Sequence, residues 1–299
     1  MIFLDTFHPI VLDTLQERFD QKEKGEPIDV TASDFDDVRY HIVVNKDADT
    51  VVNVQLALPC YKDIAAMGAS AVVDGMYGAY KTSKVDAGYD VAFNINTASM
   101  KEPAAVVAKN FSELKRNLLG APMQKCFDAL VKGQSGNLKP MVIKFRPSER
   151  MVLLPAPDRV YVYFSIYFLD EADRAIARVF LQEFSEAQRK MPQAPSVMFN
   201  VEVPSDLQKV SGFTASKDAV GYIQFQLFKN HVEGAKMDKV VSLLTSFRAY
   251  LHYHIKASKA HLHSRMRARV ESLLKVLRRA DPTNDEEGGK KAYRTYQYN

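Results

Sequence analysis

The residue types most suited to chemistry gather in one stretch, since four of the seven histidines lie between positions 252 and 263. A metal site needs imidazoles that converge on one point. On a helix, His252 and His254 stand about 200° apart, and so do His261 and His263. His254 and His261 share a face but lie about 10 Å apart along the axis. No Asp, Glu or Cys accompanies them, so we expect no metal site.

The sequence also lacks the short motifs of common active sites. It contains no Gly-rich phosphate loop, no dinucleotide-binding fingerprint, no Cys-x-x-Cys pair and no Gly-x-Ser-x-Gly elbow. Asp34, Asp36 and Asp37 could suggest paired carboxylates, but their position before a strand is typical of a turn or a helix cap. The pattern favours a protein that is not an enzyme and binds no cofactor.

The distinctive property of the histidine-rich stretch is its charge. Between Arg248 and Ala280 there are nine basic side chains and one acid, Glu271, which makes this segment +8 in a chain of +4. Charge concentrated on one element marks a surface for an acidic partner, which could be nucleic acid, anionic lipid or protein. The basic residues are Arg248, Lys256, Lys259, Arg265, Arg267, Arg269, Lys275, Arg278 and Arg279.

These residues belong to a segment from Val240 to Ala280 that contains neither Pro nor Gly. A single helix over it would be ~60 Å long. Its apolar positions repeat every ~3.5 residues, a spacing typical of a seam against another long helix. Packing of this face on the protein's own sheets is the alternative, chiefly for the first half. The seam consists of Val240, Leu244, Phe247, Leu251, His254, Ser258, Leu262, Met266, Val270, Leu273 and Leu277.

A second line of residues lies about 140° from Phe247 around the helix and is uniformly basic. Most charged helix faces are simply solvated. Here no acid is interleaved to form stabilising pairs, which favours an acidic partner over a solvated face. The line consists of His252, Lys256, Lys259, His263 and Arg267.

The rest of the chain mixes helix and strand patterns. Helical spacing is expected over 5–20, 60–80 (interrupted near Gly75 and Gly78) and 103–131. β-Branched runs predict a hairpin from 38–44 and 51–58 and a strand at 88–95. After a cluster of Gly, Ser, Asn and Pro at 132–140, strands are expected at 141–145, 151–154, 159–168, 196–203 and 221–228, and 175–185 is ambiguous. A hairpin, a Gly-Tyr strand and a long helix occur twice, which leaves a duplication open.

Composition gives the expected compartment. The chain is 46% hydrophobic and 25% charged, which excludes wholesale disorder. Cys60 and Cys126 are too few for a disulfide scaffold and suit a reducing compartment. The first twenty residues lack a basic region and carry Asp5 and Asp13, so they do not predict a signal peptide. Without 18 consecutive apolar residues, no membrane span is expected, and the interpretation is a cytosolic protein.

The segment from Phe247 to Pro282 resembles the family of the 34-kilodalton subunit (subunit 2) of the actin-related protein 2/3 complex. The match includes Phe247, Arg248, Tyr250 to Lys256, Ser258 to Ala260, His263 and Arg265 to Ala268. Shorter matches occur at Asp34–Ile42, Leu114–Asn117, Val179–Phe184 and Gly221–Phe228. The resemblance extends over about residues 1–282.

The resemblance implies an α+β fold with two similar α/β modules, each an antiparallel sheet flanked by helices, followed by a long C-terminal helix. The corresponding divisions are 1–133, 134–230, 231–281 and a flexible tail at 282–299. The family's role would be structural: the chain would pair with the 20-kilodalton subunit (subunit 4) and bind the side of the mother actin filament from which a branch grows. The expected location is the cytoplasmic actin cytoskeleton, at the cell cortex or projections.

Two sets of contacts on the helix follow as hypotheses. For the partner subunit, or alternatively the chain's own core, they are Phe247, Tyr250, Leu251 and His254. For the acidic actin filament they are Lys256, Lys259, His263, Arg265, Arg267 and Lys275. The alternative is a peripheral protein whose basic helix binds anionic lipid or nucleic acid. No nucleic-acid-binding motif supports that alternative, and an occupied seam would leave no apolar face for lipid, so neither nucleic acid nor stable membrane insertion is expected.

Overall fold

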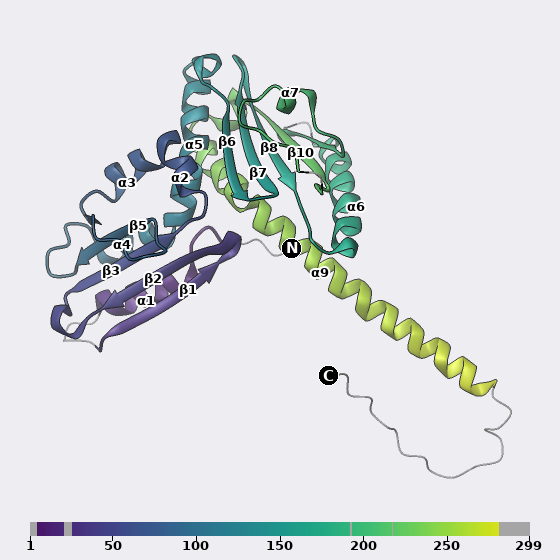
Figure 1. Cartoon of the computed structure of the whole chain (residues 1–299), viewed down its shortest axis with the longest axis horizontal. Helices are drawn as coiled ribbons and strands as arrows, with labels where there is room; N and C mark the ends of the chain where they lie inside the picture. The colour runs from purple at the N-terminus through teal and green to yellow at the C-terminus, as the bar shows by residue number, and fades with distance from the viewer. Residues whose placement is uncertain (1–4, 21–25, 192, 217, 281–299) are drawn as a thin grey trace, which may run out of the picture. The chain divides into compact units, whose positions relative to one another are not determined.

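The computed structural model describes residues 5–20, 26–191, 193–216 and 218–280 (Figure 1). Residues Met1–Ile255 form one compact unit that contains both sheets of the protein, and Lys256–Asn299 form a second unit. The division predicted after residue 133 falls between the helix α5 (Leu114–Val131) and the strand β6 (Met141–Arg146). The predicted flexible tail at 282–299 lies outside the described residues.

The first sheet is antiparallel, with strand order β1-β2-β3-β5-β4. The predicted hairpin is confirmed as β2 and β3, and the strand predicted at 88–95 is β5. The edge strand β1, which pairs with β2 along its whole length, was not expected from the sequence. The strands are β1 (Ile28–Asp34), β2 (Val38–Val44), β3 (Val51–Ala57), β4 (Lys81–Thr82) and β5 (Val91–Asn96).

The second sheet repeats the same arrangement, with order β6-β7-β8-β10-β9, and all of its strand pairs are antiparallel. In both sheets the first three strands form a meander. The fourth strand in the chain lies at the edge of the sheet, and the fifth lies between it and the meander. This common topology confirms the predicted fold class. The strands are β6 (Met141–Arg146), β7 (Glu149–Pro155), β8 (Arg159–Ile166), β9 (Ser196–Asn200) and β10 (Gly221–Phe228).

The helices differ from the predicted ones mainly at their breaks. The helix expected over 60–80 ends at Met76, near Gly75 and Gly78 as predicted. It also contains an unexpected π-turn at Ala65–Ala69, where Gly68 has φ 133°. The helix expected over 103–131 is two helices that meet at Glu113. The ambiguous segment 175–185 lies in α6. The helices are α1 (Pro9–Asp20), α2 (Tyr61–Ile64), α3 (Ser70–Met76), α4 (Ala104–Ser112), α5 (Leu114–Val131), α6 (Glu171–Gln188), α7 (Ser205–Gln208), α8 (Lys229–Val232) and α9 (Lys236–Arg279).

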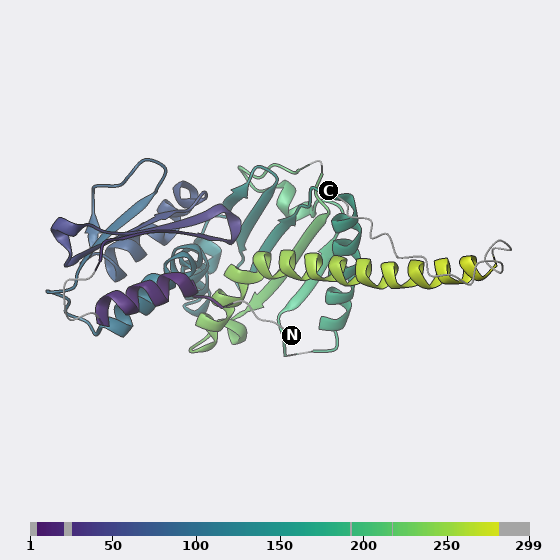
Figure 2. The same cartoon turned by 90° about the horizontal axis from the view of Figure 1, so that it is seen from below.

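The alternation of β8 explains how the second sheet builds its core. Val160, Val162, Phe164 and Ile166 are fully or almost fully buried on the face that receives α6 and the first half of α9. Tyr163, on the opposite face, belongs to a separate small cluster with Leu207 of α7 and Tyr222 of β10. The sheet therefore has two covered faces, and Figure 2 shows α9 running along one of them.

The described part of the chain also contains four short helical turns: η1 (Phe35–Asp37), η2 (Lys46–Ala48), the π-turn η3 (Ala65–Ala69) and η4 (Ser135–Asn137). Among the described residues, none of the helices combines the length and the apolar character needed to cross a membrane. No group of three or more His, Cys, Asp or Glu side chains within the described ranges is placed to hold a metal ion.

Candidate interaction site on the C-terminal helix

The long helix predicted from Val240 to Ala280 is present as α9, which begins slightly earlier, at Lys236, and ends at Arg279. Its first half belongs to the protein's own core. Val241, Leu244, Leu251 and Ile255 are almost completely inaccessible to solvent. Within that half, the alternative of packing on the chain's own sheets is therefore correct.

The four residues proposed for a partner helix all contact this chain itself. Phe247 is buried and stacks edge to face on Phe225 with ring centroids 4.9 Å apart. Leu251 is completely buried. His254 is half-buried between two aromatic rings: its ring centroid lies 4.1 Å from that of Tyr250 and 6.4 Å from that of Phe180 in α6. For Phe247 and Leu251, the structure shows the core contact that the sequence left as an alternative.

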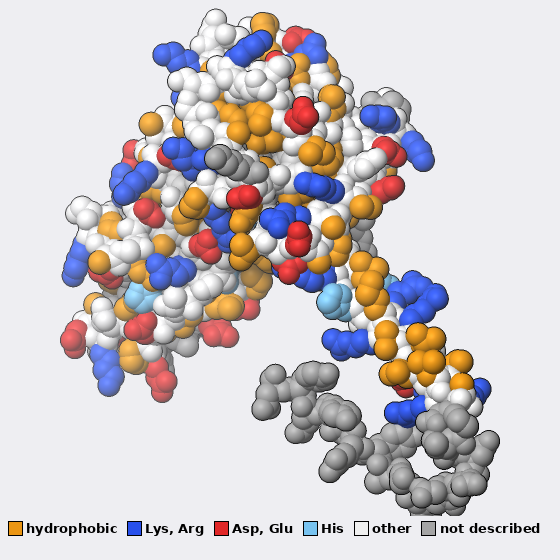
Figure 3. All heavy atoms as spheres, turned by 45° about the vertical axis from the view of Figure 1, so that its right-hand side comes forward, with side chains coloured by type: hydrophobic (Ala, Val, Ile, Leu, Met, Phe, Trp, Pro, Cys, Tyr) orange, Lys and Arg blue, Asp and Glu red, His pale blue; other side chains and the backbone are white. Residues whose placement is uncertain are grey.

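The second half of α9 carries the apolar seam on an exposed helix. Met266 and Leu273 are 61% and 59% exposed. Lys and Arg side chains flank this row of apolar side chains in Figure 3. Long cationic side chains beside an apolar stripe are typical of a helix that meets another helix. The exposed members of the seam are Leu262, Met266, Val270, Leu273 and Leu277.

The residues proposed for filament contact differ in their surroundings. Lys256, His263, Arg265 and Arg267 are exposed, whereas Lys259 is half-buried. Lys275 is exposed but forms an ion pair of 3.1 Å with Glu271, one turn earlier. Glu271 is the one acid counted in this stretch, and its ion pair with Lys275 is exposed and contributes little to stability.

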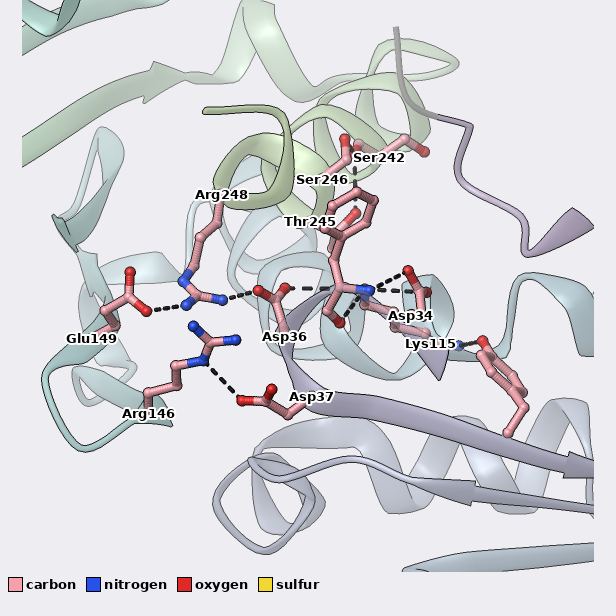
Figure 4. Close-up of polar contacts among 12 residues, drawn as sticks. Asp34, Asp36, Asp37, Lys115, Arg146, Glu149, Ser242, Thr245, Ser246 and Arg248 are labelled. Carbon is pink, nitrogen blue, oxygen red and sulfur yellow. Dashed lines mark hydrogen bonds and ion pairs between the residues drawn. The ribbon is translucent and has the colours of Figure 1, made fainter. Parts of the chain in front are cut away.

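Two residues of the basic stretch are withdrawn from solvent to different degrees, since Arg248 is buried and His252 is half-buried. Arg248 is buried in the core stripe of α9, where its guanidinium forms ion pairs with Asp36 of η1 and Glu149 of β7 (Figure 4). His252 lies 3.3 Å from the second oxygen of Glu149 and stacks on Phe168 at 4.4 Å. Counting Arg248 as surface charge was wrong, because a sequence gives no sign of which cation has buried acidic partners.

We call the buried ion pairs of Arg248 with Asp36 and Glu149 the ionic junction, and burial changes the pKa of its arginine. Removal from water lowers the pKa of Arg248 to about 10, which still leaves it charged at neutral pH. Its side chain and those of Asp36 and Glu149 are at most 8% exposed. A buried charge of this kind is tolerated only with paired, hydrogen-bonded partners. The junction thus joins the first sheet, the second sheet and α9.

The acids before β2 are therefore more than a turn signal. The cap interpretation is confirmed for Asp34, whose carboxylate accepts a 2.6 Å hydrogen bond from the Phe35 N–H. Asp34 also pairs with Lys115 of α5 at 3.1 Å, and Asp37 pairs with Arg146 of β6 at 2.9 Å. Burial lowers the pKa of Lys115, while Asp34 opposes that shift. The three acids of residues 33–38 therefore each form an ion pair with a different element of the fold.

Comparison with known proteins agrees with these features. Residues 54–284 match the family model described as Arp2/3 complex, 34 kD subunit p34-Arc. The chain is 33% identical to an actin-related protein 2/3 complex subunit 2 from Schizosaccharomyces pombe, over 94% of this chain and 95% of the relative. It is 32% identical to the protein of the same name from Dictyostelium discoideum, over 94% of each chain. The chain therefore belongs to the family of the 34 kD subunit of the Arp2/3 complex.

Proposed function

We propose that this chain pairs with the 20-kilodalton subunit through α9 and binds the side of a mother actin filament during branched nucleation. Family membership makes the chain a structural, non-catalytic subunit of the Arp2/3 complex in the cytoplasmic cytoskeleton. The specific partner and the filament contact are the proposed steps. A position at the cell cortex or in projections belongs to the same proposal.

The observation that carries the pairing is the exposed seam of α9. Five apolar side chains at helix–helix spacing are exposed from Leu262 to Leu277. An exposed apolar row of this length on a helix is a surface for a partner. A second amphipathic helix at a shallow angle matches its period of ~3.5 residues. We assign the seam to the 20-kilodalton subunit.

The basic side chains support the filament contact. His263, Arg265 and Arg267 are exposed on the part of α9 beyond the core. A row of cations attracts an acidic filament mainly through long-range electrostatics, so the affinity should fall as salt rises. Lys256, Lys259 and Lys275 are included in the same proposed surface.

The test is cosedimentation of the purified complex with actin filaments. Replacing Lys259→Glu and Arg267→Glu should weaken binding while the complex still assembles. A matched control, Lys62→Glu with Lys109→Glu, makes the same charge change at exposed positions of α2 and α4 and should leave binding near the wild-type level. Loss of assembly in the α9 variant would show instead that these residues form a subunit interface. Equal weakening by both variants would indicate a non-specific charge effect.

A further inference from the structure

The turn η1 holds an unusual backbone conformation. Asp36 and Asp37 have φ of 71° and 61°, which places two successive non-glycine residues in the left-handed region. Such a conformation is disfavoured for a residue with a Cβ and persists where its surroundings fix it. Strained positions of this kind concentrate at sites that present a group to a ligand or partner.

Three ion pairs from three different elements hold this turn in place. Asp34 pairs with Lys115 of α5, Asp36 with Arg248 of α9, and Asp37 with Arg146 of β6. Lys115 also donates a 2.9 Å hydrogen bond to the carbonyl of Phe35. The three carboxylates and the Phe35 carbonyl are thus all held by other elements of the chain. The side chain of Phe35 itself is 45% exposed. The turn therefore presents an aromatic ring to solvent on a rigid support.

Phe35 lies at a cleft of about 650 Å³ between the start of the chain, α5 and α9. Its apolar lining includes Phe7, Leu119 and Ala249. This volume falls within the range of sites that receive a small molecule or a group of side chains. We call it the Phe35 cleft.

The charges of the Phe35 cleft select against an anion. The ammonium of Lys115 has Asp34, Asp36 and the Phe35 carbonyl within 4.0 Å. The guanidinium of Arg116 bonds Asp238, the Ser242 hydroxyl and the Asn117 side chain. Both cations are thus already satisfied, and neither offers an unpaired charge to an acidic ligand.

Two hydroxyls on the α9 side of the cleft offer acceptors rather than free donors. The hydroxyl of Thr245 donates to Val241 at 2.9 Å, and that of Ser246 donates to Ser242 at 2.7 Å. Each hydroxyl has one proton to donate, so only its oxygen lone pairs remain available. Asp5 is exposed at the cleft and has no ion-pair partner within the described part of the chain. An occupant that donates hydrogen bonds and carries positive charge is therefore complementary.

We propose that the Phe35 cleft docks a segment of another polypeptide that places an apolar side chain against Phe35, Phe7 and Leu119 and a neighbouring Lys or Arg beside Asp5. A polypeptide is favoured because the chain belongs to a multi-subunit assembly, and the pairing of acceptors with an apolar floor suits a basic-apolar sequence. Of the proposed function, this inference uses only membership of the complex, and it does not depend on the filament contact.

The test introduces the photo-crosslinking residue p-benzoylphenylalanine at position 35 in the purified, assembled complex. After irradiation, mass spectrometry should identify a crosslinked peptide of another subunit in which an apolar residue lies next to a Lys or Arg. The same crosslinker at Leu169, which is 83% exposed and distant in sequence, is the matched control and should not label that peptide. Crosslinks confined to this chain, including its first four residues, or no crosslink at position 35, would overturn the proposal.

A charge swap then tests the assigned chemistry. Asp5→Lys should lower the crosslink yield several-fold, and replacing the partner's identified Lys or Arg by Asp should restore it. Asp5→Asn, which removes the charge without reversing it, decides the matter if the lysine variant does not assemble. An unchanged yield in Asp5→Asn would refute the role of Asp5. A complex that assembles but does not bind filaments leaves this experiment unaffected.

Discussion

Gly120 of α5 lies directly against Val241 of α9, so closely that a Cβ on the glycine would sit 2.5 Å from Cγ1 of the valine. Both residues are buried in the core. One turn earlier on α5, Arg116 donates to the Ser242 hydroxyl at 3.0 Å. The two helices therefore approach each other more closely than side chains on both would permit.

Gly120→Ala should destabilise the protein, although alanine is by itself the better helix former by about 1 kcal/mol. Val241 is β-branched and completely buried, so its side chain has little freedom to move aside. Overpacking of this kind costs typically about 1–3 kcal/mol. Faster hydrogen exchange in α5 of the assembled complex would show the loss, and Val241→Ala in the same chain should recover part of it. Slower exchange in the single variant would contradict the prediction.

The exposed seam should be required for assembly. Met266→Glu with Leu273→Glu places two charges where we expect a partner helix, so the 20-kilodalton subunit should no longer copurify. Ser264→Glu is the matched control because it adds a charge about 160° from Met266 around the helix. Retention of the partner by both variants would exclude the seam as its binding surface.

Removing a carboxylate from the buried ionic junction should destabilise the protein more than removing a carboxylate from an exposed ion pair. Glu149→Ala leaves the buried guanidinium of Arg248 without one of its two acids, and breaking a buried pair typically costs about 3–5 kcal/mol. Asp37→Asn removes an ion pair whose partners are 40% and 66% exposed, which typically contributes about 0–1 kcal/mol. Protease resistance of the assembled complexes should therefore fall for the first variant and stay close to wild type for the second. Equal resistance of the two variants would argue against the junction.

The two cysteines should be unreactive in the folded chain. Burial raises the pKa of Cys60 and of Cys126 to about 12, so very little thiolate exists at pH 7.5. Because the folded pKa lies above the unfolded one, the thiols favour the folded state below about pH 9 and lose that contribution as the pH rises towards 12. Titration with a chromogenic disulfide should show no reaction until denaturant is added. Rapid labelling of the native complex would disprove the burial of these thiols.

The sequence predicted the structure most reliably for elements whose apolar residues follow a single strand or helix period. β8 alternates between two faces, and both faces are covered as that alternation requires. The length of α9 followed from the absence of Pro and Gly. The repeated order of elements left a duplication open, and the two sheets share one strand order. By contrast, α5 shows little helical amphipathicity because it is buried on most sides, including Arg116, Asn117 and Pro122.

The partners of charged residues could not be read in the same way. In the sequence, Arg248 is one more cation in a basic helix, and Asp36 is one more acid in a turn. Only the tertiary structure brings them together and makes them buried partners with Glu149. Periodicity is a local property that each segment carries with it, so the residues alone determined most of the elements and the resemblance. Which charges are buried depends on contacts between segments far apart in the chain, and folding alone decides those.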